Sequence, residues 1–225
     1  HGTAIICGAA VINALHVVDK NIADVKLVTS GAGAAGMACL DLLVALGVNI
    51  ANIIVSDASG VLYEGREDLE SDRKKAYAKD VKNQSLTEAL QGADIFLGVS
   101  VAGVLKPEMI KNMAKDPLIM ALANPTPEIM PDVALEIRPD AIIATGRSDF
   151  PNQVNNVLCF PYIFRGALDV CATHINETMK TACVHALARL ARLEASEVSS
   201  KAYGGKELKF GHEYLIPQPF DPRIL

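Results

Sequence analysis

Short, strongly apolar runs alternate along this chain with longer segments in which apolar residues recur at helical spacing. The short runs predict buried strands, and the periodic segments predict helices between them. Strands that are apolar on both faces are typical of a parallel sheet covered by helices on both sides. The predicted strands cover residues 26–30, 52–57, 93–100, 117–123 and 141–145. The pattern therefore predicts an α/β fold with a doubly wound, mostly parallel sheet.

The segments between these strands predict helices whose ends carry recognisable signals. The first, over residues 2–19, is largely apolar and has Thr3 as a candidate N-cap. The other predicted helices cover 37–46, 85–90, the residues after Pro107, and 164–193. Their predicted end signals are Gly47, the Ser85–Glu88 capping box, and Thr173 or Asn176 as the cap of a second helix within 164–193.

A glycine-rich turn joins the first strand to its helix. It reads Gly31-Ala32-Gly33-Ala34-Ala35-Gly36, a G-x-G-x-x-G pattern between a strand and a helix. In that context the first glycine permits a tight turn, the second lets the backbone approach a pyrophosphate, and the third allows close helix–strand packing. The alternative is a glycine-rich turn that binds nothing. The favoured interpretation is a Rossmann-like dinucleotide site.

The second predicted strand ends in Asp57, about twenty residues past the glycines, where an acid accepts a hydrogen bond from a ribose hydroxyl. Mixed charges follow over residues 60–79 and predict a solvated loop and an exposed helix. A contact of Arg66 or Lys74 with the adenosine end of a cofactor is the alternative for that segment.

Polar side chains also follow the later strands. Ser100 follows the third, Asn124 the fourth, and Asn155 and Asn156 lie in the loop after the fifth. Carboxyl ends of parallel strands form the edge at which ligands bind in open α/β sheets, and amides offer donors and acceptors without charge. An Asx turn is the alternative for Asn124. Arg147 is either an anion clamp or a salt-bridged loop residue.

The charge, hydropathy and cysteine content of the chain exclude several classes of partner and site. The 225 residues carry a formal charge of -5, which argues against nucleic acid or an anionic membrane as partner. No apolar run approaches the roughly 20 residues that span a bilayer. The five cysteines are scattered without a C-x-x-C motif, which indicates reduced thiols and a cytoplasmic location. Cys171 and His174 form a lone C-x-x-H, which we interpret as a buried thiol and a helical histidine and not as a metal site.

We expect one domain over residues 1–225, with 204–225 as an extended C-terminal tail. The chain begins at His1 with no methionine and enters a helical pattern at once. That start suggests a piece of a longer polypeptide.

Five motifs, in this order, resemble the NAD(P)-binding part of malic enzyme. They are His1-Gly2-Thr3-Ala4; Ser30 to Gly36; Val55-Ser56-Asp57 with Tyr63-Glu64-Gly65-Arg66; Ala123-Asn124-Pro125-Thr126-Pro127-Glu128; and Asn155-Asn156 with Phe160-Pro161. The tail from Tyr214 to Arg223 is similar to the large bacterial branch, in which a phosphotransacetylase-like domain can follow.

The resemblance implies oxidative decarboxylation of malate to pyruvate, with NAD or NADP as hydride acceptor and Mg²⁺ or Mn²⁺ assisting. It implies pyrophosphate contacts from the glycine turn (Gly31, Gly33, Ala34, Ala35 and Gly36), an adenosine-ribose contact from Asp57, and a nicotinamide-side contact from Ser100. Asn124 and Asn155 would meet the nicotinamide ribose, and Asn124 and Asn156 the substrate.

The family's catalytic Lys and Tyr and its metal-binding carboxylates precede the position of His1. We therefore expect this chain by itself to bind cofactor without turning over malate. Whether it prefers NAD or NADP is left open, and the apolar first helix and tail suggest a homo-oligomer. The rival hypotheses are another NAD(P)-dependent dehydrogenase of amino or hydroxy acids and a non-enzymatic dinucleotide-sensing module.

Overall fold

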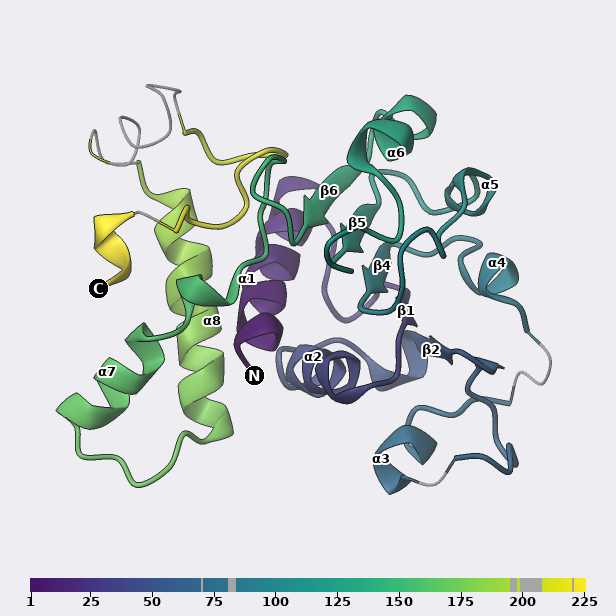
Figure 1. The fold of residues 1–225 in the computed structure, drawn as a ribbon, viewed down its shortest axis with the longest axis horizontal. Coiled ribbons are helices and arrows are strands. Elements are labelled where there is room, and N and C mark those ends of the chain that lie inside the picture. The colour runs from purple at the N-terminus through teal and green to yellow at the C-terminus, as the bar shows by residue number, and fades with distance from the viewer. Residues whose placement is uncertain (70, 81–83, 195–197, 199–207, 220) are drawn as a thin grey trace.

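A six-stranded sheet forms the centre of the fold in the computed structural model (Figure 1). Its strand order is β3-β2-β1-β4-β5-β6, and every neighbouring pair is parallel except β2 with β3. The strands are β1 (Leu27–Ser30), β2 (Ile53–Asp57), β3 (Gly60–Val61), β4 (Ile95–Gly98), β5 (Leu118–Ala121) and β6 (Ile142–Thr145). The predicted doubly wound, mostly parallel α/β fold is confirmed.

Helices cover both faces of this sheet. They are α1 (Gly2–Val17), α2 (Ala34–Ala45), α3 (Asp72–Lys75), α4 (Leu86–Ala89), α5 (Pro107–Ile110), α6 (Pro131–Ile137), α7 (Tyr162–Asp169) and α8 (Glu177–Arg192). Three short 3₁₀ turns complete the order, η1 (Ile50–Asn52), η2 (Asn156–Leu158) and η3 (Pro222–Ile224). The structure describes residues 1–69, 71–80, 84–194, 198, 208–219 and 221–225.

Alternate residues of the strands face two separate apolar clusters. Leu27 and Leu97 pack in a cluster with α1, α2 and α8, whereas Val28 and Phe96 pack in a second cluster with α4, α5 and α6. Because both faces are covered, every residue of the central strands β1, β4 and β5 is buried, and most are apolar. This burial explains the continuous apolar runs in the sequence.

Several predicted helix ends are confirmed, and one is wrong. The Ser85–Glu88 capping box is present, and the Asn176 side chain accepts a hydrogen bond from the Met179 N–H at the start of α8. Thr3, in contrast, does not cap α1, because the helix already begins at Gly2. Its hydroxyl instead donates to Asn156 Oδ1 at 2.9 Å.

Two elements were not predicted from the sequence, the short antiparallel strand β3 after Asp57 and the helix α6. The segment 164–193 contains two helices, α7 and α8, as predicted. Cys171 and His174 lie between these helices and Cys171 is exposed, so the prediction of a buried thiol and a helical histidine is wrong. Part of the predicted tail, residues 204–207 and Phe220, lies outside the described residues. No helix in the described part of the chain is long and apolar enough to cross a membrane.

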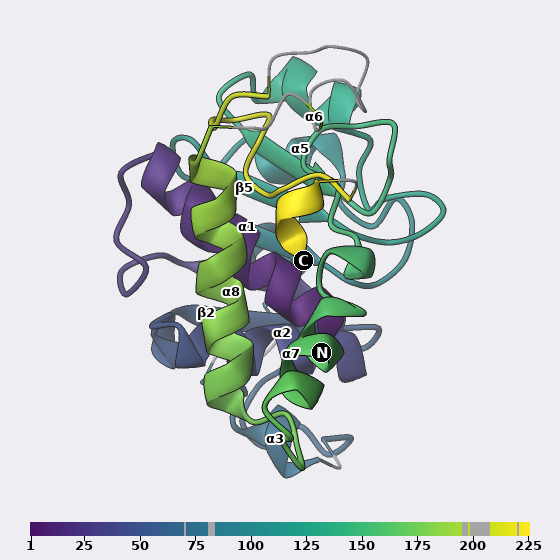
Figure 2. The same cartoon turned by 90° about the vertical axis from the view of Figure 1, so that its left-hand side faces the viewer.

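The helices α1 and α8 pack against each other (Figure 2). One buried amide ties α1 to α8 and to the segment around Leu215. The Asn13 side chain is fully buried, and its Nδ2 donates to the carbonyl oxygens of Ala188 at 2.8 Å and Leu215 at 2.6 Å. Arg192 Nε donates to Asn13 Oδ1 at 2.7 Å. Since a buried amide must be paired, Asn13 fixes how these segments meet.

Replacing Asn13 by alanine is expected to lower the free energy of unfolding by about 3 kcal/mol, because two carbonyls and a guanidinium lose their partner. Asn21→Ala is the matched control, since Asn21 is exposed and bonds only to nearby residues. Urea denaturation followed by circular dichroism measures both. Equal midpoints for the two variants would contradict the role given to Asn13.

Candidate functional site

The glycine turn after β1 brings backbone against backbone. Gly31 has φ +112°, and a Cβ there would lie 2.5 Å from the Val99 carbonyl oxygen. A Cβ at Gly36 would lie 2.0 Å from the carbonyl oxygen of Gly31. A Cβ at Gly33, in contrast, would meet no heavy atom within 4 Å. The backbone packing therefore requires glycine at positions 31 and 36. At Gly33 a side chain would meet no protein atom, so the space beside Gly33 is open.

That space lies at the start of α2. Gly33 is the N-cap of this twelve-residue helix and makes no side-chain cap hydrogen bond, and Gly33, Ala34 and Ala35 are all exposed. The first N–H groups of a helix have no partner within it, and the helix dipole places partial positive charge there. An exposed N-terminus without a capping side chain is suited to a phosphate group.

Asp57, at the carboxyl end of β2, is held by a buried arginine. Arg66 Nη2 donates to both Asp57 carboxylate oxygens, at 2.7 and 2.8 Å, and its Nε donates to Asp68 Oδ1 at 2.5 Å. Its Nη1 donates to the Gly60 carbonyl at 3.2 Å. The Arg66 side chain is only 6% exposed, so the prediction of a solvated segment is wrong at Arg66. Lys74 Nζ lies 3.9 Å from Asp57 Oδ2.

These contacts give the cluster a fixed charge. The hydrogen bond from Arg66 lowers the pKa of Asp68 to about 2, and both carboxylates raise the pKa of the guanidinium. The segment after β3 brings Arg66 back to that strand, where its Nη1 donates to the carbonyls of Gly60 and Val61. In the sequence, the only indication that Arg66 lies near Asp57 was its place in the Tyr63-Glu64-Gly65-Arg66 motif, which resembles malic enzyme.

A chain of hydrogen bonds joins the ends of β1, β4 and β5. The hydroxyls of Ser30 and Ser100 lie 2.9 Å apart. Glu128, fully buried, accepts from the Ser100 N–H on Oε1 and from the Ala123 N–H on Oε2, each at 2.9 Å. We call these two hydrogen bonds of Glu128 to the Ser100 and Ala123 N–H groups the Glu128 clamp. The clamp was not predicted from the sequence, although Glu128 is the last residue of the Asn-Pro-Thr-Pro-Glu motif.

A glycine makes room for the clamp. A Cβ at Gly98 would lie 2.4 Å from the Glu128 carboxyl carbon, so the acid reaches under the end of β4 only because residue 98 has no side chain. Glu128 therefore fixes the loop that carries Ser100 and the loop that carries Asn124 in relation to each other.

The three predicted asparagines follow strands that end at this same edge. Asn124 comes three residues after β5, is exposed, and makes no side-chain hydrogen bond to any described residue. The loop after β6 returns along the strand, where the Val154 N–H donates to the Thr145 carbonyl at 2.7 Å. Asn155 then caps η2 through the Val157 N–H, and Asn156 accepts from Thr3.

Arg147 proves to be the salt-bridged alternative. Its Nε and Nη2 donate to the two carboxylate oxygens of Asp149, at 2.8 and 2.6 Å. The guanidinium is therefore already occupied by an acid within its own loop. No cluster of three or more His, Cys, Asp or Glu side chains suited to a metal ion occurs among the described residues.

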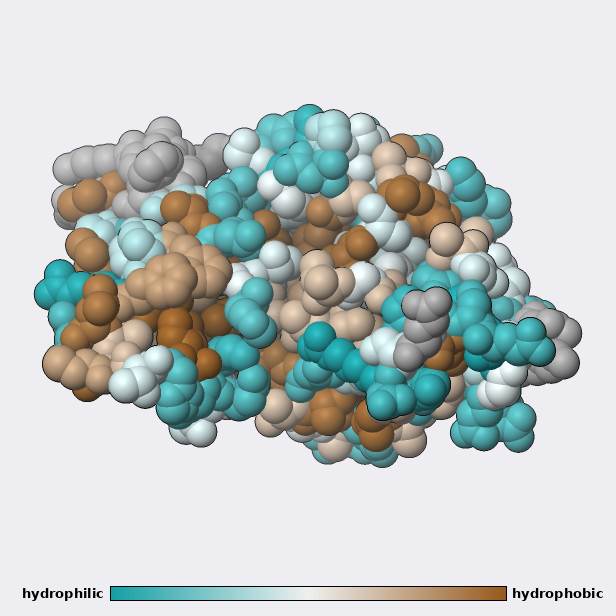
Figure 3. Space-filling view, turned by 60° about the horizontal axis from the view of Figure 1, so that its bottom comes forward, coloured by the Kyte–Doolittle hydropathy of each residue, from teal (hydrophilic) through white to brown (hydrophobic). Residues whose placement is uncertain are grey.

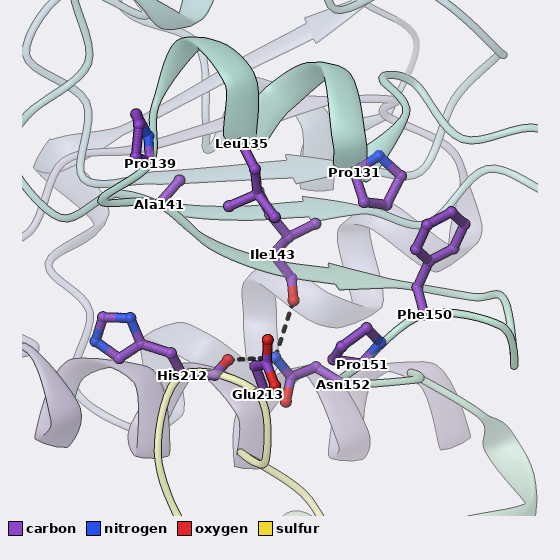
Figure 4. A pocket seen from close by; sticks show the side chains of 10 residues that line it. All are labelled: Pro131, Leu135, Pro139, Ala141, Ile143, Phe150, Pro151, Asn152, His212 and Glu213. Carbon is purple, nitrogen blue, oxygen red and sulfur yellow. Dashed lines mark hydrogen bonds between the residues drawn. The ribbon is translucent and has the colours of Figure 1, made fainter.

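A separate pocket of about 360 Å³ lies between α6, β6 and the segment around His212 (Figure 4). Leu135, Ile143 and Phe150 give it an apolar lining. The amide nitrogen of Asn152 is paired with the carbonyls of Ile143 and His212. None of the predicted site residues lines this pocket, so we place the candidate site at the glycine turn.

Comparison with known proteins gives a consistent assignment. Residues 1–202 match the family model described as malic enzyme, NAD binding domain. The NADP-dependent malic enzyme of Salmonella typhimurium is 62% identical over all of this chain, and the NAD-dependent malic enzyme of Rhizobium meliloti is 60% identical. The chain covers 30% and 29% of these two relatives, which is less than a third of their length.

Solved structures agree with the sequence relatives. The malic enzyme of Entamoeba histolytica superposes with a TM-score of 0.85 at 38% identity, covering 99% of this chain and 45% of that one. The NAD-dependent malic enzyme of Thermotoga maritima gives a TM-score of 0.81 at 39% identity, covering 99% and 55%.

The Glu128 clamp generates a test that needs no ligand. In Glu128→Gln the new amide group faces one of the two backbone N–H donors, so one donor loses its partner and the free energy of unfolding falls by about 1–3 kcal/mol. Glu136→Gln, on the exposed side of α6, is the control and should leave stability unchanged. Chemical denaturation compares the two variants. An unfolding midpoint for Glu128→Gln equal to that of wild type would rule out the clamp.

Proposed function

The chain belongs to the malic enzyme family, as an NAD-binding domain, and we propose on that premise that it serves the oxidative decarboxylation of malate to pyruvate and CO₂. The observation that carries the proposal is the open space at Gly33, in front of the exposed, uncapped N-terminus of α2. A dinucleotide diphosphate fits that feature, because unpaired N–H groups and a positive dipole end meet its negative charge.

We assign the rest of the dinucleotide along the carboxyl edge of the sheet. The pyrophosphate contacts Gly31, Gly33, Ala34, Ala35 and Gly36, and the adenosine ribose meets Asp57. Ser100, Asn124 and Asn155 lie on the nicotinamide side. Malate meets Asn124 and Asn156. When bound, the nicotinamide accepts the hydride from C2 of malate.

This chain's own contribution is to bind and orient. The Ser30–Ser100–Glu128 chain of hydrogen bonds fixes the loops at the ends of three strands, so the polar groups on them are held before a ligand arrives. The Asn side chains supply neutral donors and acceptors for a carboxylate, a hydroxyl or a carboxamide. The general acid and base are proposed to come from outside residues 1–225.

The described residues do not by themselves fit a Mg²⁺ or Mn²⁺ site, since they bring no three His, Cys, Asp or Glu side chains together. We therefore assign no step of the reaction to a metal held by this chain. Metal ligands, if the reaction uses them, are proposed to lie elsewhere in the longer polypeptide.

The surface suggests how the chain meets other parts of such a polypeptide. Apolar side chains gather on the left of Figure 3, the side on which α7 lies in Figure 1. Phe164 and Leu168 of α7 and Val170 just after it are exposed. We propose residues 1–225 as one dinucleotide-binding domain whose α7 face is covered in a homo-oligomer or by another domain. Burial of such a patch is favourable in proportion to its apolar area.

Dinucleotide binding through the glycine turn is tested by two single-methyl changes. Gly33→Ala adds a methyl that meets no protein atom, so stability should hold while NAD or NADP affinity falls at least ~10-fold, or about 1.4 kcal/mol. Gly36→Ala, which forces a methyl against the Gly31 carbonyl, should lower stability itself. Titration calorimetry and thermal denaturation separate the two effects. Unchanged dinucleotide affinity in Gly33→Ala would refute the proposal.

The choice between NAD and NADP is proposed to depend on the Asp57 cluster. Arg66 offsets part of the negative charge of Asp57, although it also pairs with Asp68, so Asp57 repels a 2′-phosphate less than an unpaired carboxylate would. Lys74 is the nearest cation to Asp57 that is not already engaged in short hydrogen bonds to described residues. We propose that it faces the 2′-hydroxyl or 2′-phosphate of the adenosine ribose.

Lys74→Ala should therefore weaken NADP binding about fivefold, equivalent to about 1 kcal/mol, and leave NAD binding nearly unchanged. Lys75→Ala is the matched neighbour, since Lys75 pairs with Asp72 instead. Affinities are compared at one fixed, low salt concentration because the interaction is screened. Equal losses for both coenzymes, or for both lysines, would show that Lys74 does not discriminate.

A further inference from the structure

The loop that joins β6 to η2 carries two of the residues assigned to the reacting end of the site. It leaves the sheet after Thr145 and ends at Asn155 and Asn156. Among the described residues, its one bridge back to the sheet pairs Gln153 with Thr145. A loop of this kind takes its position from the scaffold that holds it, so the contacts along the loop decide where its last two amides lie.

Asn152 is the buried polar residue of this loop. It is 2% exposed and has φ +54°, a left-handed backbone conformation that asparagine adopts more readily than most residues. Its Nδ2 donates to the carbonyl oxygens of Ile143 at 2.9 Å and His212 at 2.7 Å (Figure 4). Its Oδ1 accepts from the Leu215 N–H at 2.8 Å. One amide therefore joins the loop both to β6 and to a segment about sixty positions later.

That later segment, residues 214–216, is fixed on its other side by α1. All three of its residues are buried. The Leu215 carbonyl accepts from Asn13 Nδ2 at 2.6 Å, while the Leu215 N–H donates to Asn152. Leu215 and Ile216 also pack in the apolar cluster that contains α1 and α2. The 214–216 segment thus connects the loop to the main core of the fold.

Few other hydrogen bonds hold the loop. Among the hydrogen bonds between described residues, only those of Asn152 and the Thr3–Asn156 bond link residues 146–156 to parts of the chain beyond β6. The other polar side chains of the loop bond within it or to β6. Asn152, three positions before Asn155, is therefore the main anchor of the loop.

We propose that Asn152 is a positioning residue for the malate end of the site. By holding the loop against the 214–216 segment, it places the amides of Asn155 and Asn156 where the substrate meets them. The Asn152 side chain is buried, and its amide nitrogen and oxygen are both engaged, so it acts through the loop without touching malate itself. The inference rests on the proposed roles of Asn155 and Asn156.

A positioning role affects the two substrates unequally. Most of the proposed coenzyme contacts lie at the ends of β1 and β2, whereas β6 is the last strand on the other side of the sheet. A displaced loop should weaken malate binding and leave those contacts intact. A loss of stability alone reduces the folded fraction, which lowers the apparent kcat and changes neither KM.

Asn152→Gly is the variant that isolates the hydrogen bonds. Glycine adopts φ +54° without strain, so the backbone conformation is kept while the three side-chain bonds are lost. The matched control is Asp19→Gly. Asp19 has φ +53°, is exposed just after α1, and makes no side-chain hydrogen bond to any residue that the structure describes.

The first test is steady-state kinetics in the complete polypeptide that contains this chain, because the general acid and base are proposed to lie outside residues 1–225. Asn152→Gly should raise the KM for malate about tenfold and change the KM for the coenzyme far less, and Asp19→Gly should match wild type. Circular dichroism confirms that each variant is folded. A wild-type KM for malate in Asn152→Gly, or an equal rise in both KM values, would overturn the proposal.

The second test does not depend on malate turnover. Hydrogen–deuterium exchange read by mass spectrometry compares the same polypeptides, and Asn152→Gly should speed exchange in peptides that cover 150–158 and Leu215, whose N–H loses its acceptor. Peptides from α2 should exchange as in wild type. Unchanged exchange at 150–158 would overturn the anchoring role. Failure of the wild-type polypeptide to oxidise malate would instead refute the proposed function, and faster exchange in Asn152→Gly would still support the anchor.

Discussion

The close approach of α2 to the end of β1 is the constraint from which the candidate site follows. The Gly36 α-carbon faces the Gly31 carbonyl at a distance that leaves no room for even one methyl group. The helix N-terminus is therefore held against the carboxyl edge of the sheet with its first N–H groups outward. Because all strands but β3 run parallel, the polar residues that follow them reach the same edge.

The loops after β4 and β5, like the N-terminus of α2, must be held in place at the carboxyl edge of the sheet. Backbone N–H groups just past the ends of β4 and β5 have left the sheet ladder, and buried donors without partners are costly. Glu128 satisfies two of them with one carboxyl group, in the space that Gly98 leaves free. One acid, Glu128, and one glycine, Gly98, thirty positions earlier in the chain, thus fix the two loops that follow β4 and β5.

Most of the order of strands and helices, with the exception of β3 and α6, was predictable from the sequence because it depends on apolar periodicity and on local turn residues. The fold class, the glycine turn and the Ser85–Glu88 capping box all arise from neighbouring positions. Long-range side-chain contacts were not predictable in this way. Thr3 is a residue type that often caps helices, yet its hydroxyl bonds to Asn156. Arg66 is buried although it belongs to a segment whose many charges predict exposure to solvent. Site roles carried over from the resemblance remain proposals.

The Asp57 cluster shows why an acid after the second strand is an incomplete guide to coenzyme choice. A carboxylate discriminates against a 2′-phosphate through its charge but meets a ribose through its lone pairs. Arg66 offsets part of the charge of Asp57, which it shares with Asp68, and takes up one acceptor position on each Asp57 oxygen, while the Ser59 N–H takes another on Oδ1. Oδ2 therefore retains acceptor capacity. If the proposed ribose contact is made there, discrimination between the two coenzymes would depend on the cations around Asp57 as well as on the acid itself.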